Sequence, residues 1–174
     1  RLAGPLNESA LHRALIALVE RHESLRCCFP VKNGEASVQF NPVYNPLTIT
    51  DLTAFSGTEQ ESLVTEWTRK HAQMRFDLST GPLLSSCLLK LEPQAYILLF
   101  NMHHIISDGW SMGGLFRDWS QLYRAFAQNQ VLHISKLPIQ YADYAAWQRN
   151  WLQGELLEQQ LAYWEKKLIG APEL

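Results

Sequence analysis

The sequence lacks the features that mark membrane-spanning, secreted and nucleic-acid-binding proteins. Its longest apolar run covers only residues 95–100, whereas a helix that crosses a bilayer needs about 20 apolar residues. The N-terminus has no signal-peptide pattern and no initiator methionine, so we expect a fragment of a longer chain. The 15 Lys and Arg residues and 17 Asp and Glu residues form no run of one sign, which disfavours nucleic acid and membrane surfaces as partners.

Cysteine is also scarce, with three residues at Cys27, Cys28 and Cys87. The first two are neighbours that cannot easily bridge each other, and the flanks of all three are apolar. We therefore predict reduced core side chains in a cytoplasmic protein. A reactive thiol is the less favoured alternative, because no basic residue supports a thiolate beside any of them.

What is present is enough apolar sequence for a core, since 47% of the 174 residues are hydrophobic. Periodicity and turn residues indicate strands mixed with helices, which favours an α+β or mixed α/β layered domain. The six tryptophans fall mostly on helix faces, and this favours core packing for them over ligand stacking. Helices are predicted near 8–22, 59–75, 110–126, 139–152 and 155–168, strands at 25–29, 37–40, 47–52, 83–91 and 95–102, and a loop at 131–138.

Three of these elements carry more detailed predictions. Asn7 is expected to cap the first helix, in which Leu11, Leu15 and Leu18 recur at helical spacing. Residues 32–35 have the composition of a hairpin turn, and the apolar strands at 83–91 and 95–102 are expected to form a buried hairpin.

Two histidines, a carboxylate and a glycine lie close together where the last predicted strand ends, within residues 102–111 (Met-His-His-Ile-Ile-Ser-Asp-Gly-Trp-Ser). Neighbouring side chains on a strand point to opposite faces, so His103 and His104 are not expected to bind one metal ion together. Zinc-ligand spacing is absent as well, so we predict no metal site. Instead, one histidine is expected to face a cavity, while the other lies inside and needs a hydrogen-bond partner.

The residues after the histidines offer further support for chemistry. Asp108 is placed to hold a histidine or an arginine, and Gly109 permits a positive φ or the close approach of a substrate. The helix that follows presents free N–H groups suited to a developing oxyanion. A histidine at a strand end is, however, more often structural than catalytic. No serine elbow is present and nothing orients Ser107 as a nucleophile, which favours direct transfer between two bound substrates.

Three stretches, in order, resemble motifs of the condensation domains of nonribosomal peptide synthetases, within the chloramphenicol-acetyltransferase-like superfamily. Residues 21–29 (Arg-His-Glu-Ser-Leu-Arg-Cys-Cys-Phe) are similar to the family's early motif. Residues 102–111 resemble its His-His-x-x-x-Asp-Gly signature, and residues 141–147 (Tyr-Ala-Asp-Tyr-Ala-Ala-Trp) resemble the motif that follows. The resemblance implies a half-domain with a mixed sheet flanked by helices. Residues 1–174 would be the N-terminal subdomain, without the family's first motif and without the C-terminal subdomain that forms the other wall of the channel.

The resemblance also assigns roles. His104 would face the channel and act on the acceptor amine, whereas His103 and Asp108 would mainly shape the loop. Asp108 would form a salt bridge with an arginine, either Arg26 or one in the missing half. Gly109 would offer a backbone approach or an N–H group. Two further residues would line the substrate channel, namely Trp110 and Ser111. The Arg-His-Glu start of the early motif and the Trp110-Ser111 ending look most similar to the subtype that joins two L-residues.

The implied reaction is aminolysis of a thioester that yields an amide bond. Donor and acceptor would arrive on the 4′-phosphopantetheine arms of two peptidyl carrier domains, with no cofactor bound directly and an adenylation domain nearby. The alternatives are an epimerisation domain, an ester-forming acyltransferase of the same superfamily, and a non-catalytic carrier-docking module. We expect the isolated fragment to be inactive, because half of the channel is absent.

Overall fold

A computed structural model describes residues 1–130 and 135–172. The chain forms two compact units, Arg1–Lys136 and Leu137–Leu174, which are described separately below. In the described residues, no helix is both long and apolar enough to cross a membrane. The predicted loop at 131–138 lies partly outside the described residues.

The first unit is built on a four-stranded mixed sheet with the strand order β1-β8-β7-β6. The predicted hairpin of β7 and β8 is confirmed, while β6 runs parallel to β7 and is connected to it through helix α2. The elements are β1 (Leu2–Ala3), β6 (Leu47–Asp51), α2 (Gly57–Ala72), β7 (Leu84–Glu92) and β8 (Ala95–Met102). This sheet confirms the predicted mixed α/β layered architecture.

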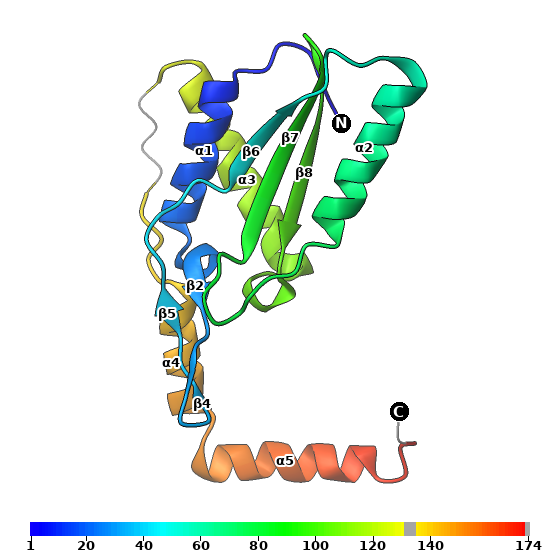
Figure 1. The fold of residues 1–174 in the computed structure, drawn as a ribbon. Helices are drawn as coiled ribbons and strands as arrows, with labels where there is room; N and C mark the ends of the chain where they lie inside the picture. The colour runs from blue at the N-terminus through cyan, green and yellow to red at the C-terminus, as the bar shows by residue number, and fades with distance from the viewer. Residues whose placement is uncertain (131–134, 173–174) are drawn as a thin grey trace. The chain divides into compact units, whose positions relative to one another are not determined.

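Helices cover both faces of the sheet, which explains why β7 is almost continuously apolar. Helices α1 (Glu8–Arg21) and α3 (Gly109–Ala127) lie on one face and α2 lies on the other (Figure 1). Along β7, Leu84 and Leu88 pack toward α1 and α3, whereas Cys87 and Leu89 pack toward α2. A strand that buries both faces needs apolar residues at successive positions rather than at alternate ones.

Helix α1 forms as the sequence predicts. The Asn7 side chain caps its first turn by accepting a hydrogen bond from the Ala10 N–H at 2.9 Å. Leu11, Leu15 and Leu18 recur at helical spacing, and each is at most 1% exposed. The packing of this stripe against α3 fixes the main core of the unit.

The predicted strand at 25–29 is wrong in its first half. Residues Glu23–Arg26 form a 3-10 turn (η1), in which the Leu25 N–H donates to the His22 carbonyl at 3.0 Å. The turn buries Leu25 completely, so tertiary packing outweighs the strand preference of the apolar run. The short strands nearby are β2 (Cys27–Cys28), β3 (Val31–Lys32), β4 (Glu35–Ala36) and β5 (Gln39–Phe40), with the predicted hairpin turn between β3 and β4.

The three cysteines are free thiols in the core, which confirms the prediction of reduced, buried side chains. Cys27 donates to the Glu23 carbonyl at 3.5 Å, and burial raises the pKa of its thiol to about 11. A thiol with so high a pKa stays protonated at neutral pH and is a poor nucleophile.

The second unit consists of α4 (Tyr141–Trp151) and α5 (Gly154–Leu168), and neither helix contains a buried residue. A row of rings runs along α4, with centroids 5.5–5.9 Å apart. Its members are Tyr141, Tyr144, Trp147 and Trp151. The prediction that most tryptophans pack in the core is therefore wrong for this unit, where each is more than 50% exposed. Helical spacing places aromatic residues on one face but does not reveal what covers that face.

Candidate functional site

The histidine loop begins where β8 ends. Its backbone continues the sheet for one more residue, because the His103 N–H donates to the Leu83 carbonyl at 2.9 Å. The chain then turns into a short 3-10 helix, η2 (His104–Ile106), whose last residue is buried. The prediction that the two histidines point to opposite faces of one strand is therefore wrong in its geometry. They are separated nevertheless, because His103 is extended and His104 starts the turn.

His103 is half-buried and has the partner that its position requires. Its Nδ1 accepts a hydrogen bond from the Ile105 N–H at 3.0 Å, which leaves the ring proton on Nε2. The ring meets Phe76 edge to face, with centroids 6.2 Å apart and an interplanar angle of 84°. These contacts hold His103 as a side chain that shapes the loop.

His104, in contrast, is exposed. No hydrogen bond restrains its imidazole within residues 1–130 and 135–172, although the charge of Asp108 lies close enough to interact with it. Of the two histidines, His104 is thus the one that can exchange a proton with a bound molecule.

Asp108 forms the N-cap of α3. Its carboxylate Oδ1 accepts from the Ser111 N–H at 2.8 Å, and the Ser111 hydroxyl accepts from the Asp108 N–H at 2.9 Å. This reciprocal pair is a capping box. The Ser111 N–H and hydroxyl hold the pKa of Asp108 below its ordinary value. The helix start, predicted as a site for an oxyanion, is therefore already occupied by a carboxylate.

The ion pair predicted between Arg26 and Asp108 is not formed. Arg26 Nη2 lies 3.7 Å from Glu23 Oε1, and Nη1 donates to the Asn41 carbonyl at 3.1 Å. Arg26 is the last residue of the 3-10 turn, and its side chain meets Glu23 and Asn41 rather than α3. An arginine outside the described residues remains the other expected partner.

A different carboxylate on α3 binds the early motif, and the sequence reasoning missed it. Asp118 Oδ2 accepts from Arg21 Nε at 2.8 Å and from His22 Nε2 at 3.0 Å. Burial would raise the pKa of Asp118, but these two hydrogen bonds outweigh it and the pKa lies below its ordinary value. A signal existed, because Asp118 interrupts the apolar stripe between Leu115 and Leu122.

The remaining predicted residues surround the start of α3. Gly109 does not adopt a positive φ, but a Cβ at this position would meet no atom within 4 Å, so the backbone is open to close approach. Trp110 is 95% exposed, which is unusual for so large an apolar side chain. Ser111 lies nearby, with its hydroxyl engaged in the cap.

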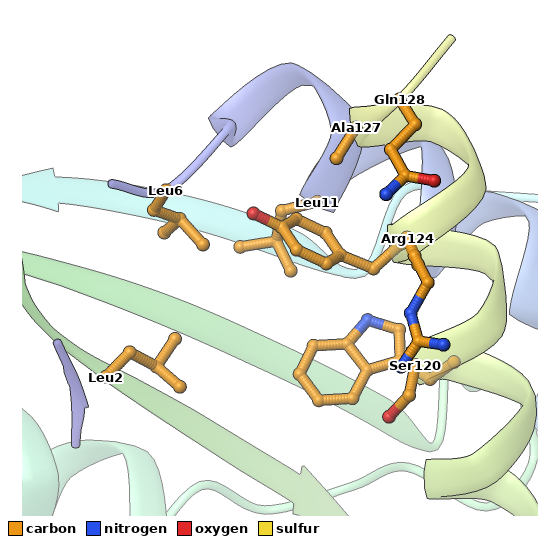
Figure 2. A pocket seen from close by; sticks show the side chains of 9 residues that line it. Leu2, Leu6, Leu11, Ser120, Arg124, Ala127 and Gln128 are labelled. Atoms are coloured by element: carbon orange, nitrogen blue, oxygen red, sulfur yellow. The ribbon is translucent and has the colours of Figure 1, made fainter. Parts of the chain in front are cut away.

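No group of three or more metal-ligating side chains occurs in the described part of the chain. A cavity of about 450 Å³ lies elsewhere, between the N-terminal segment, α1 and the second half of α3 (Figure 2). Leu2 and Leu6 lie on one side of it and Arg124 on the other. Because none of its lining residues belongs to the histidine loop, the cavity does not coincide with the candidate site.

The chain is similar in sequence to known proteins along its whole length. A family model described as "Condensation domain" matches residues 1–174. A linear gramicidin synthase from Brevibacillus parabrevis is 43% identical over 175 residues, and malpinin synthetase of Mortierella alpina is 42% identical over 174 residues. Each match covers 100% of this chain but only 2% of the relative, so the chain corresponds to a small part of these synthetases.

Solved structures show the same fold. The X-domain from teicoplanin biosynthesis superposes with a TM-score of 0.85 at 28% identity, covering 99% of this chain and 38% of that chain. The starter condensation domain of rhizomide synthetase has a TM-score of 0.85 at 20% identity, covering 99% of this chain and 41% of that one, and this likeness bears on the fold alone. Since the family model and both synthetases match along the full chain, it belongs to the condensation-domain family.

Proposed function

We propose that this chain supplies the histidine-bearing wall of a site that forms an amide bond during nonribosomal peptide synthesis. The observation that carries the proposal is the exposed imidazole of His104 in the short turn before α3, which no hydrogen bond restrains within the described residues, in a chain of the condensation-domain family. The neighbouring Trp110 and the open space beside Gly109 support it, because a substrate can approach the backbone there.

The proposed reaction joins two substrates without an enzyme-bound intermediate. The acceptor amine attacks the thioester carbonyl, a C–N bond forms, the C–S bond breaks, and the leaving thiolate ends as a thiol. His104 takes or shares the proton that the amine loses, a contribution of about 10²–10⁴-fold for a positioned base. Orientation of the two substrates in one channel supplies the rest, because the thiolate is already a good leaving group.

The proposal includes partners. Two carrier domains present the donor and the acceptor on phosphopantetheine arms, and the C-terminal half of the domain forms the opposite wall of the channel. An adenylation domain lies next to it in a cytoplasmic synthetase. The size of the synthetases matched by this chain supports such a setting, since it covers only 2–3% of the linear gramicidin synthases.

The test is His104→Ala in the complete condensation domain, with both carriers loaded and the product measured by mass spectrometry. We expect amide formation to be abolished while the melting temperature stays near that of the unaltered domain, because His104 is exposed and makes no hydrogen bond within the described residues. His103→Ala is the matched comparison. It should lower the melting temperature, because the Ile105 N–H loses its acceptor. Near-normal product from His104→Ala would contradict the proposal.

The same assay separates the alternatives. Solved structures with the same fold include an epimerization domain of tyrocidine synthetase B, so chiral analysis of the carrier-bound residue is part of the measurement. Inversion at the α-carbon without a new amide would favour epimerisation, and product only with a hydroxyl acceptor would favour ester formation. Carrier binding without turnover would favour a docking role, for which the solved complex of the teicoplanin X-domain with OxyB offers a precedent in that protein.

A further inference from the structure

A buried carboxylate in the middle of α3 has no part in the chemistry proposed above. Asp118 lies on the helix face that packs against the core, and its side chain is only 10% exposed. A buried ion pair is seldom a source of stability, because apolar side chains of similar size stabilise a fold as well or better. The use best supported in other proteins is to fix the register of the elements that it joins.

Two donors converge on a single oxygen of Asp118. Arg21 Nε and His22 Nε2 lie 2.8 and 3.0 Å from Oδ2. Arg21 is the last residue of α1, and the His22 N–H closes that helix by donating to the Leu18 carbonyl at 3.1 Å. The donors therefore lie at the end of α1 itself, so the contact joins the end of α1 to the middle of α3.

Apolar packing alone defines the position of α3 less sharply. The leucine stripes of α1 and α3 meet through contacts that are not directional, whereas hydrogen bonds to a carboxylate fall off steeply with distance and angle. A small slide or rotation of α3 would weaken the apolar contact gradually but would distort both bonds to Asp118.

A displacement of α3 would also move the histidine loop, because the loop leads into the first turn of the helix. Asp118 lies nine residues after Gly109, the first residue of the helix, which corresponds to about 14 Å along the axis. This stretch contains Gly113 and Gly114 but no proline, and it belongs to one unbroken helix, so a displacement of the middle of α3 carries to its first turn. The Asp108–Ser111 capping box fixes its first turn, and Ser107 alone separates Asp108 from the short turn that carries His104.

We propose that Asp118 is a positioning residue: by binding Arg21 and His22 it fixes the axial and rotational position of α3, and with it the position of His104. The inference rests on the proposed function, because it presupposes that the placement of His104 matters for transfer. It gives the early Arg-His motif a role in catalysis without contact with the substrate.

The test compares three variants in the complete condensation domain with loaded carriers. Asp118→Asn keeps the size of the side chain but removes the charge, and Asp118→Glu keeps the charge but displaces the carboxylate by about 1.5 Å, one C–C bond. Glu66→Gln is the matched control, since it makes the same carboxylate-to-amide change at an exposed position on α2. Circular dichroism establishes a temperature at which each variant is folded.

At that temperature we expect Asp118→Asn to lower kcat at least about tenfold while KM for each carrier stays within about twofold, because misplacement by about 1 Å is costly for a reaction governed by orientation. Asp118→Glu should recover the melting temperature more than it recovers kcat, a divergence that a purely structural role would not produce. The control should match the unaltered domain in both kcat and melting temperature.

A folded Asp118→Asn domain with the kcat of the unaltered domain would overturn the inference. If Asp118→Asn does not fold, Asp118→Glu decides: unaltered kcat in that variant would overturn it, and reduced kcat at unaltered KM would support it. His104→Ala run in parallel separates the two proposals. Activity retained in His104→Ala removes the proposed function itself, whereas loss there with full activity in both Asp118 variants removes only the positioning role.

Discussion

The first turn and the middle of α3 show how differently two parts of one helix are stabilised. At the first turn, Trp110 is 95% exposed and a local capping box joins Asp108 to Ser111. In the middle, Leu115 and Leu122 are buried and Asp118 binds α1 through two hydrogen bonds. The first turn can remain exposed because the buried segment supplies the packing that holds the helix in place.

Truncation of one large side chain in each part should separate stability from activity most strongly. Leu122→Ala is expected to lower the free energy of unfolding by about 2–5 kcal/mol, because Leu122 is only 8% exposed. Trp110→Ala removes a larger side chain but should change that free energy by no more than about 0.5 kcal/mol. Its effect should be on transfer between carriers, measured at saturating and at low carrier concentration. Urea unfolding measures both free energies. Equal destabilisation by the two variants would contradict the difference between the two parts of α3.

The cap at Asp108 should contribute less than the buried leucine and should not depend on charge. Asp108→Ala is expected to lower the melting temperature by roughly 2–4 °C, since an N-cap acceptor is lost. Asp108→Asn should stay close to the unaltered domain, because asparagine caps a helix as well as aspartate does. If both variants are destabilised alike in the complete domain, the carboxylate takes part in an ion pair with a residue outside the described chain.

Acidification should weaken the buried segment before it affects the cap. Burial lowers the pKa of His22 against the opposing pull of Asp118, so the unfolded chain binds the proton more tightly than the folded one. Stability should therefore fall as the pH drops below about 6.5 toward the folded pKa of His22. His71 adds to the same slope, because burial lowers its pKa as well. Asp118 and Asp108, whose pKa values are lowered, lose their contribution only below about pH 4.

Melting temperatures between pH 7.5 and 5 measure this slope. His22→Gln should flatten it without abolishing it, because His71 still titrates and the glutamine amide can still donate to Asp118. If the melting temperature of His22→Gln changes with pH as steeply as that of the unaltered domain, burial does not lower the pKa of His22.

The smallest effect on stability should come from Gly109→Ala. The added Cβ meets no atom within 4 Å and Gly109 does not have a positive φ, so the variant should fold as well as the unaltered domain. If a substrate approaches the backbone there, transfer should nevertheless decline. Gly113→Ala is the matched control on the same helix, where a Cβ also meets open space. Unaltered activity in both variants would exclude the proposed approach at Gly109.

Local patterns predicted most of the fold, because they reflect interactions between near neighbours. The cap at Asn7, the leucine stripe of α1 and the hairpin of β7 and β8 all follow from residues close together in sequence. The 3-10 turn at Glu23–Arg26 did not, because it depends on the burial of Leu25 by distant elements. The exposed rings of α4 were misjudged for a related reason: periodicity identifies an apolar face but not its surroundings.

The candidate site was predicted in part. The separation of His103 and His104 is observed, although a turn rather than a strand produces it. The predicted partner of Arg26 was wrong. The pairing of acidic and basic side chains depends on how segments far apart in the sequence come together. Asp118 could have been noticed as a charge within an apolar stripe, but its two partners at the end of α1 could be identified only from the fold.

The row of rings on α4 has a practical consequence for the handling of this chain. Tyr141, Tyr144, Trp147 and Trp151 present their rings side by side on a helix without a buried residue. Exposed apolar surface of this kind promotes self-association when a domain is produced without what normally covers it. Preparations limited to residues 1–174 should therefore become increasingly cloudy as they are concentrated, and replacing Trp147 and Trp151 with glutamine should keep them clear.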